Sequence, residues 1–146
     1  MAARGRDLKV AEPGQEIEGF GGMRLRLDRV DPDVLVMEAS YSGEAGMPPV
    51  HLHPSQTERF EVLDGSMRAK IGDEERVYEV GEVFEVPAGT PHQMAAQGPT
   101  RTRWEVSPAM RTAEFFERLY GEGPGSAREM GESFFAEFSD EFRLAE

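Results

Sequence analysis

The sequence contains no cysteine, which excludes both disulfide bonds and thiolate metal sites. It also lacks long apolar runs, since nothing approaches the roughly 20 apolar residues of a membrane-spanning helix. The opening stretch, MAARGRDLKVAEPGQE, has no apolar segment of the kind that a secretion signal carries. We therefore expect a soluble, cytoplasmic protein that makes no use of membranes.

Basic residues are scarce as well. The chain has 16 Lys and Arg against 28 Asp and Glu, which gives a formal net charge of -12 at pH 7. A surface of this sign repels nucleic-acid backbones and anionic lipids, and no basic stripe offsets it. The composition argues against nucleic acid as a partner and leaves a small-molecule ligand or substrate open. A length of 146 residues suits one domain.

Most of the chain before Pro108 alternates apolar and polar residues in short runs that are broken by Gly, Pro and Asp. A period of two is typical of antiparallel strands, and eight or nine such runs favour a sandwich, jelly roll or barrel. In SMRAKI, for example, Met67 and Ala69 share one face and two basic residues share the other. The preceding Asp64-Gly65 pair predicts a β-hairpin that joins ERFEVL to SMRAKI.

After Pro108 the spacing becomes helical. RTAEFFERLY predicts one helix and SAREMGESFFAEFSDEFRLAE a second, with Ser126 and Glu129 as its capping box. The second helix carries an apolar residue at every fourth position, which gives the stripe Met130, Phe134, Phe138 and Phe142. We interpret this stripe as a packing surface against the barrel or a partner subunit. The chain thus divides into a β-barrel over residues 1–107 and a C-terminal helical extension over residues 108–146.

The chain has three histidines, and their spacing is informative. His51 and His53 lie two apart on a predicted strand, so their rings face the same side. His92 follows a Pro-Ala-Gly-Thr-Pro turn on another strand. Glu58 shares a face with the apolar Phe60, and a buried carboxylate is costly unless a cation or hydrogen bonds compensate it. A single strand histidine is more often an ordinary hydrogen-bonded residue, but four such groups together favour a metal site with three nitrogen donors and one oxygen donor.

These residues fall in two ordered motifs that resemble those of the cupin superfamily. The first motif spans residues 46–65 and comprises Gly46, His51, His53, Glu58 and Gly65; the second spans 81–96 and comprises Gly81, Pro87, Gly89 and His92. The spacer after Gly46 is one residue short, and Ala96 stands where the family usually has Asn. The resemblance covers about residues 22–107.

The resemblance implies an all-β fold, the double-stranded β-helix or jelly-roll barrel, with the helical extension outside it. It further implies that His51, His53, Glu58 and His92 bind one divalent transition metal. Fe(II) is favoured, with Mn, Ni, Cu or Zn as alternatives. Glu58 is the ligand best able to shift and act as a catalytic base. Cupins also commonly assemble as homodimers, and we expect one here.

The alternation predicts which side chains face the barrel interior: Phe60, Val62, Met67, Tyr78, Met94 and Trp104. An apolar and aromatic pocket suits a small hydrophobic molecule better than a phosphorylated sugar. The chain then resembles the small cupin dioxygenases, which predicts a metal-dependent oxidoreductase. Two alternatives stay open, namely a non-catalytic, metal-supported ligand-binding protein and a metal-dependent isomerase or lyase.

Overall fold

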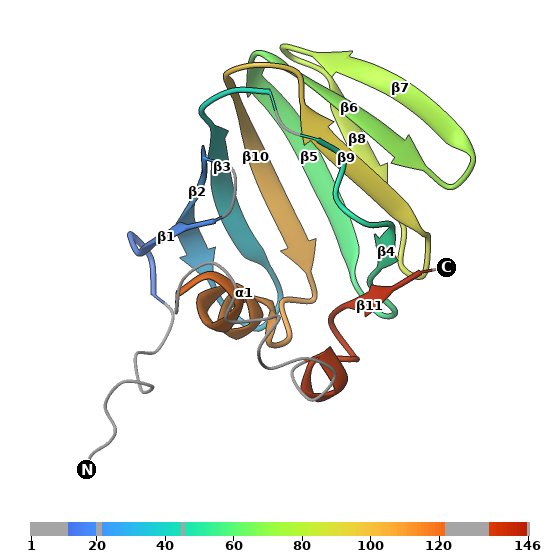
Figure 1. The fold of residues 1–146 in the computed structure, drawn as a ribbon. Helices are drawn as coiled ribbons and strands as arrows, with labels where there is room; N and C mark the ends of the chain where they lie inside the picture. Colours follow the sequence, from blue (N-terminus) through green and yellow to red (C-terminus); the bar gives the residue numbers. More distant parts are fainter. Residues whose placement is uncertain (1–11, 20–21, 45, 122–134, 146) are drawn as a thin grey trace.

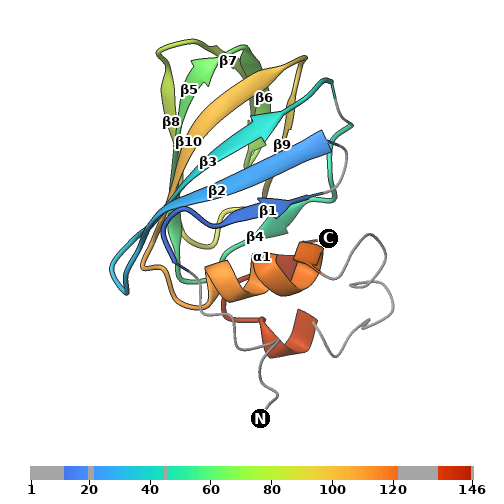
Figure 2. The same cartoon turned by 90° about the vertical axis from the view of Figure 1, so that its left-hand side faces the viewer.

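The computed structural model describes residues 12–19, 22–44, 46–121 and 135–145, which form two antiparallel sheets that face each other (Figures 1 and 2). The first sheet has the strand order β1 (Glu16–Glu18), β2 (Met23–Val30), β3 (Leu35–Tyr41), β10 (Thr100–Ser107), β5 (Thr57–Asp64) and β8 (Val83–Val86). The second has the order β11 (Arg143–Leu144), β4 (His51–Leu52), β9 (His92–Ala96), β6 (Ser66–Ile71) and β7 (Glu74–Glu79). The predicted all-β jelly roll is confirmed. The described residues form eleven strands rather than the predicted eight or nine. The strands β1, β4 and β11 are only two or three residues long, which is too short to show an alternating pattern in the sequence.

The predicted first helix is also confirmed as α1 (Thr112–Gly121), which lies at one end of the barrel (Figure 2). Its apolar side buries Phe115 and Phe116 in a cluster with Leu25 and Leu27 of β2. Burial of such a side chain contributes roughly 1.5–3 kcal/mol. The helix thus closes the end of the barrel that the second sheet leaves open.

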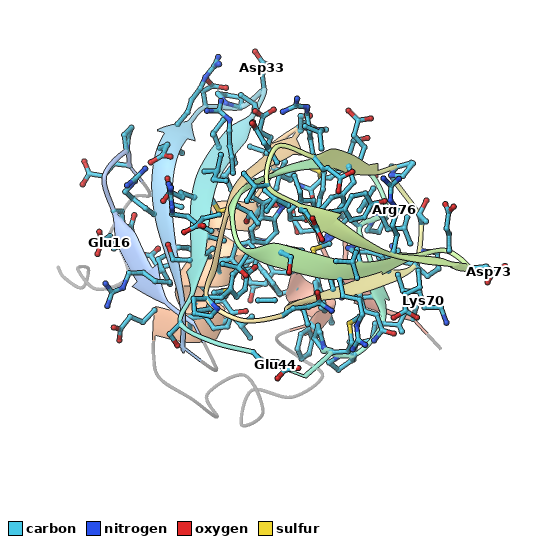
Figure 3. All side chains as sticks on the ribbon, turned by 90° about the horizontal axis from the view of Figure 1, so that it is seen from above. Glu16, Asp33, Glu44, Lys70, Asp73 and Arg76 are labelled. Carbon is cyan, nitrogen blue, oxygen red and sulfur yellow. The ribbon has the colours of Figure 1, made fainter. Side chains whose placement is uncertain are left out.

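A second apolar cluster fills the space between the two sheets. Its buried members are Phe60, Val62, Met67, Ala69, Phe84, Val86 and Ala96. Charged side chains lie outside, and the view from above shows Lys70, Asp73 and Arg76 at the periphery of the barrel (Figure 3). The period-two alternation therefore assigns the inward and outward faces of β5 and β6 correctly.

The predicted hairpin at Asp64 and Gly65 is wrong. β5 belongs to the first sheet and β6 to the second, so the chain crosses between the sheets here instead of folding back on itself. Gly65 has a φ of +80°, and a Cβ at this position would collide with the carbonyl oxygen of Pro99 and lie 2.6 Å from Oγ1 of Thr100. The tight hairpin instead joins β6 to β7 at Gly72. An Asp-Gly pair predicts that the chain turns, but it does not determine which strand the following residues pair with.

The predicted second helix is wrong at its C-terminal end. Ser126, Glu129, Met130 and Phe134 lie outside the described residues, but residues 143–144 form strand β11, which pairs with β4. The helix therefore does not continue to the end of the segment, although Phe138 and Phe142 both pack against the barrel cluster, as the stripe predicts. Among the described residues, no helix is long and apolar enough to cross a membrane.

Candidate metal site

The structure brings all three histidines together at the end of the barrel. His51 lies on β4 and is paired across the sheet with His92, the first residue of β9. His53 follows directly after β4. One ring nitrogen from each histidine lies within 4.8 Å of the others. His53 and His92 are buried, and His51 is partly buried. Three imidazoles at this separation can share one metal ion.

The outer ring nitrogen of each histidine faces a backbone carbonyl. The Nδ1 atoms of His51, His53 and His92 lie 3.1, 2.7 and 2.9 Å from the carbonyl oxygens of Pro49, Glu141 and Thr90, respectively. Because a carbonyl oxygen only accepts hydrogen bonds, each Nδ1 carries the proton as the donor. In the neutral ring each Nε2 is then left with a free lone pair, which is the form of the ring that binds a metal.

Glu58 lies on β5 among apolar neighbours and supplies a fourth group. Its Oε1 lies 3.2 Å from Nε2 of His53 and 3.1 Å from Nε2 of His92. Its Oε2 accepts a hydrogen bond of 2.9 Å from Nε1 of Trp104. Nε2 of His53 and Oε1 of Glu58 are nevertheless buried without a hydrogen-bond partner. Two unsatisfied lone pairs that face each other in a protein interior are costly, and a cation between them would satisfy both.

Burial and neighbouring charge both set the pKa values in the site. Burial lowers the pKa of His51 to about 4, and His92 acts in the same direction. Burial would raise the pKa of Glu58, but close contacts with His53 and His92 outweigh it and lower this pKa to about 2. Burial acts to lower the pKa of His53, but Glu58 and the Glu141 carbonyl outweigh it and raise this pKa. The site thus holds an ionised carboxylate beside the neutral ring of His51 at neutral pH.

The turn of the second motif is tied directly to the first. Gly89 has a φ of +80°, and its N–H donates a 2.8 Å hydrogen bond to the carbonyl of His53. Thr90 N–H donates to the carbonyl of Pro87 at 3.2 Å, which closes the turn. A glycine tolerates this left-handed conformation without strain. The turn therefore fixes His92 relative to His53.

The six predicted pocket residues lie inside the barrel but are packed against one another. Phe60, Val62 and Met67 are buried, and Tyr78, Met94 and Trp104 pack against the same cluster. Rings stack from Tyr78 through Phe84 and Phe60 to Trp104, with centroids 4.2, 4.9 and 5.4 Å apart. A cavity of about 430 Å³ has His92 of the site in its wall, and its other lining residues, which include the outward-facing Lys70, are Val50, Gly72, Asp73, Pro91 and Gln93. Substrate contact by the six residues remains a prediction.

Sequence reasoning missed two residues of the site, both in the segment interpreted as a helix. The carbonyl of Glu141 faces His53, and the ring of Phe142 stacks on His51 with centroids 4.7 Å apart and planes inclined by 21°. The fourfold spacing concealed them because both Phe138 and Phe142 fit the packing interpretation and pack against the barrel cluster. No pattern in the segment indicates that Phe142 contacts His51 as well.

Comparison with known proteins agrees with this geometry. Residues 38–107 match the family model described as Cupin domain. No curated protein sequence matches the chain significantly. An RmlC-like cupin from Shewanella frigidimarina NCIMB 400 superimposes with a TM-score of 0.60 and 19% identity, over 66% of this chain and 86% of that one.

Two further solved structures are similar. KdgF from Halomonas sp. has a TM-score of 0.55 and 20% identity, over 60% of this chain and 79% of that one. Streptomyces Pac13, described as a unique nucleoside dehydratase, has a TM-score of 0.54 and 17% identity, over 64% of this chain and 75% of that one. At such identities the likeness shows a shared fold and carries no reaction with it.

Proposed function

This chain is a member of the cupin domain family, and on that premise we propose that it is a mononuclear metal-dependent oxidoreductase of the dioxygenase type. The proposed ligands are His51, His53, His92 and Glu58. The observation that carries the proposal is the convergence of one ring nitrogen from each of three histidines, with the buried carboxylate of Glu58 3.2 and 3.1 Å from Nε2 of His53 and His92. A purely structural polar cluster would satisfy its own hydrogen bonds, whereas this one leaves buried atoms unpaired.

The donor set limits the metal. Imidazole and carboxylate donors suit Fe, Mn, Ni, Cu or Zn, and we propose Fe(II) because it supports oxygen chemistry. A six-coordinate ion held by four side chains would keep two open positions and would supply a Lewis acid for a substrate and an oxidant. Glu58 contributes as a ligand in this proposal. Its low pKa makes it a weak base, so the catalytic-base role predicted for it has less support.

Charge and polarity suggest the substrate class. A divalent ion with one carboxylate and neutral imidazoles gives a net charge of +1 in a buried site, which favours a substrate with an ionisable oxygen, such as a phenol or an enol. The interior side chains are apolar or aromatic, and Arg59, Arg68 and Lys70 lie on the outer faces of their strands. We therefore propose a small apolar or aromatic molecule as the substrate, oxidised by dioxygen.

The first test is metal content and oxygen uptake. Protein expressed without an affinity tag should contain close to one transition metal per chain, and the iron-loaded protein should consume oxygen with a member of a phenol, diketone and thiol panel. Wild-type protein that cannot be loaded with any of the five metals would contradict the metal site. A loaded protein that consumes no oxygen with any compound would contradict the oxidoreductase assignment alone.

Two other functions remain as second candidates for a metal-loaded protein that does not consume oxygen. The packed interior, with Phe142 against His51, favours a non-catalytic protein that binds a small ligand. The same donor set would also supply a Lewis acid to a metal-dependent isomerase or lyase, which needs no oxidant. Product formation without oxygen consumption would support the lyase, and ligand binding without turnover would support the binding protein.

A further inference from the structure

The end of the chain lies across the histidine site. We name residues Phe135–Ala145 the C-terminal strap. Its strand β11 pairs with β4, the strand that carries His51, and the two lie side by side near the C-terminus (Figure 1). The N–H of Ala145 also donates a 2.9 Å hydrogen bond to the carbonyl of Val50. The strap is thus an added edge strand of the second sheet at the site itself.

Phe142 is clamped between the site and the core. Its ring stacks on His51 on one side, at 4.7 Å, and against Phe115 of α1, at 5.0 Å and 24°. It also meets His53 edge-on at 6.0 Å. Phe115 is buried in the core cluster of the barrel end. A ring held between two such neighbours has little freedom to move aside.

The residue before Phe142 holds the strap in register. The buried carboxylate of Glu141 accepts a 3.2 Å hydrogen bond from the N–H of Arg111, just before α1 begins. Its carbonyl oxygen lies 2.7 Å from Nδ1 of His53. Glu141 therefore links the start of α1 to His53. Because Phe142 is the next residue, these contacts of Glu141 also restrict where the ring of Phe142 can lie.

We infer that Phe142 is a specificity-determining residue, which limits by its size what can approach the histidines from the side of His51. The inference rests on the proposed metal site for its functional meaning, because His51 and His53, which Phe142 contacts, are two of the proposed ligands. Small ligands would pass beside the ring, whereas planar ring ligands would collide with it. A smaller side chain at this position should admit larger ligands.

The covering role can be tested without any metal. Diethyl pyrocarbonate acylates neutral imidazole nitrogens, and peptide mapping by mass spectrometry measures its reaction with each histidine. In chelator-treated protein, Phe142→Ala should react several times faster at His51, and Phe142→Leu should lie between this variant and the wild type. Asp140→Ala, an exposed position on the same strap, should react like the wild type. Equal rates at His51 in all folded variants would overturn the inference.

The size limit needs the cobalt-loaded protein. Visible spectra of the cobalt centre should report the binding of azide, which is small and linear, and of imidazole, which is a planar ring. Phe142→Ala should bind imidazole about tenfold more tightly, a change of about 1.4 kcal/mol, while azide affinity stays within about twofold. Equal changes for both probes would overturn the inference. Wild-type protein that takes up no cobalt would refute the proposed function, and the acylation rates would still decide whether Phe142 covers His51.

Phe142→Leu also serves as a control in case Phe142→Ala does not fold. Leucine keeps apolar contact with Phe115 but lacks the flat ring, so this variant should fold even if the alanine variant does not. Its circular dichroism spectrum and melting temperature should match those of Asp140→Ala closely. If Phe142→Leu folds normally and behaves as the wild type with both probes, ring size is not the determinant.

Discussion

The indole Nε1 of Trp104 donates a 2.9 Å hydrogen bond to Oε2 of Glu58. Trp104 is held in turn by stacking on Phe60, at 5.4 Å, and by edge-on contact with Phe116, at 5.2 Å. The aromatic core therefore fixes the orientation of the carboxylate and directs its other oxygen toward His53 and His92. Because core side chains orient the carboxylate of Glu58, substitutions in the core should change metal affinity.

Trp104→Phe tests this link, because it removes the donor but keeps a ring in the stack. Loss of a group that orients a ligand typically weakens metal binding by about 10- to 100-fold, and we expect a decrease in that range in competition titrations. Tyr78→Phe is the matched control, since Tyr78 lies at the other end of the stack and should leave affinity unchanged. Unaltered metal affinity in folded Trp104→Phe would refute the orienting role.

The proposed ligands themselves make a second prediction. His51→Ala, His53→Ala and His92→Ala should each lose most bound metal in elemental analysis, because each removes one of few donors. Glu58→Gln keeps the size but removes the charge, so metal retention should weaken while the fold persists.

Glu61→Gln is the control for Glu58→Gln because Glu61 lies on the same strand, β5, with its side chain on the opposite face. It should retain the metal content of the wild type. A fully loaded Glu58→Gln protein would show that the carboxylate is not a ligand.

Much of this site could be predicted from the sequence because its geometry follows from short-range rules. Side chains two residues apart on a strand lie on the same face of the sheet, so His51 and His53 are expected to point to the same side. Glu58 alternates in phase with apolar residues, which places its carboxylate on the inner face. The fold itself followed from regular alternation and from the two motifs. These features depend on the spacing of residues along the chain, which can be read directly from the sequence.

The failures involve contacts that local spacing does not specify. Asp64-Gly65 marks a bend in the chain, but whether the next strand pairs with β5 or joins the other sheet depends on Thr100 and the rest of β10. The helical spacing predicts that the residues after Phe142 continue the helix, yet residues 143–144 pair with the edge of β4 as β11. Tertiary pairing overrides propensity in both cases.

The crossing at Gly65 makes a third prediction. Gly65→Ala should be strongly destabilising, by about 3 kcal/mol or more, because the left-handed backbone is strained and the new Cβ meets the backbone of β10. Gly72→Ala has a similar φ of +61° but open space around its Cβ, so only the strain of about 1–2 kcal/mol should apply. Urea denaturation gives both values. Equal losses would mean that the close approach at Gly65 carries no penalty.

The expected homodimer is a fourth prediction. Exposed apolar side chains remain on the described surface at Val77, Val80 and Val83, near the outer strands β7 and β8. Proteins tend to cover such groups, and a two-fold interface is the commonest way. Light scattering at micromolar concentration should give the mass of a dimer. A monodisperse monomer under these conditions would refute the prediction.

The last prediction concerns pH and compares metal-loaded with chelator-treated protein. In chelated protein the folded pKa of His51 is about 4, against an ordinary value of 6.5. Between about pH 6.5 and pH 4, His51 is protonated in the unfolded chain but neutral in the folded chain. The free energy of unfolding therefore decreases as pH falls through this interval, by up to roughly 3 kcal/mol. His53 acts oppositely: its folded pKa is raised, so its contribution is full below 6.5 and is lost as pH rises through that pKa. Glu58 stabilises above about 4.5, and its contribution is lost as pH falls toward 2.

Bound metal changes this profile because protons and metal compete for the same nitrogens. His53, with its raised pKa, should take up a proton before His51 as pH falls, and metal release should follow with more than one proton bound per ion lost. Since a metal that binds only the folded chain stabilises it, the melting temperature of loaded protein should fall steeply over this interval. Below it the loaded and chelated curves should converge. A difference in melting temperature that stayed constant from neutral pH down to the carboxylate range would show that the histidines do not hold the metal.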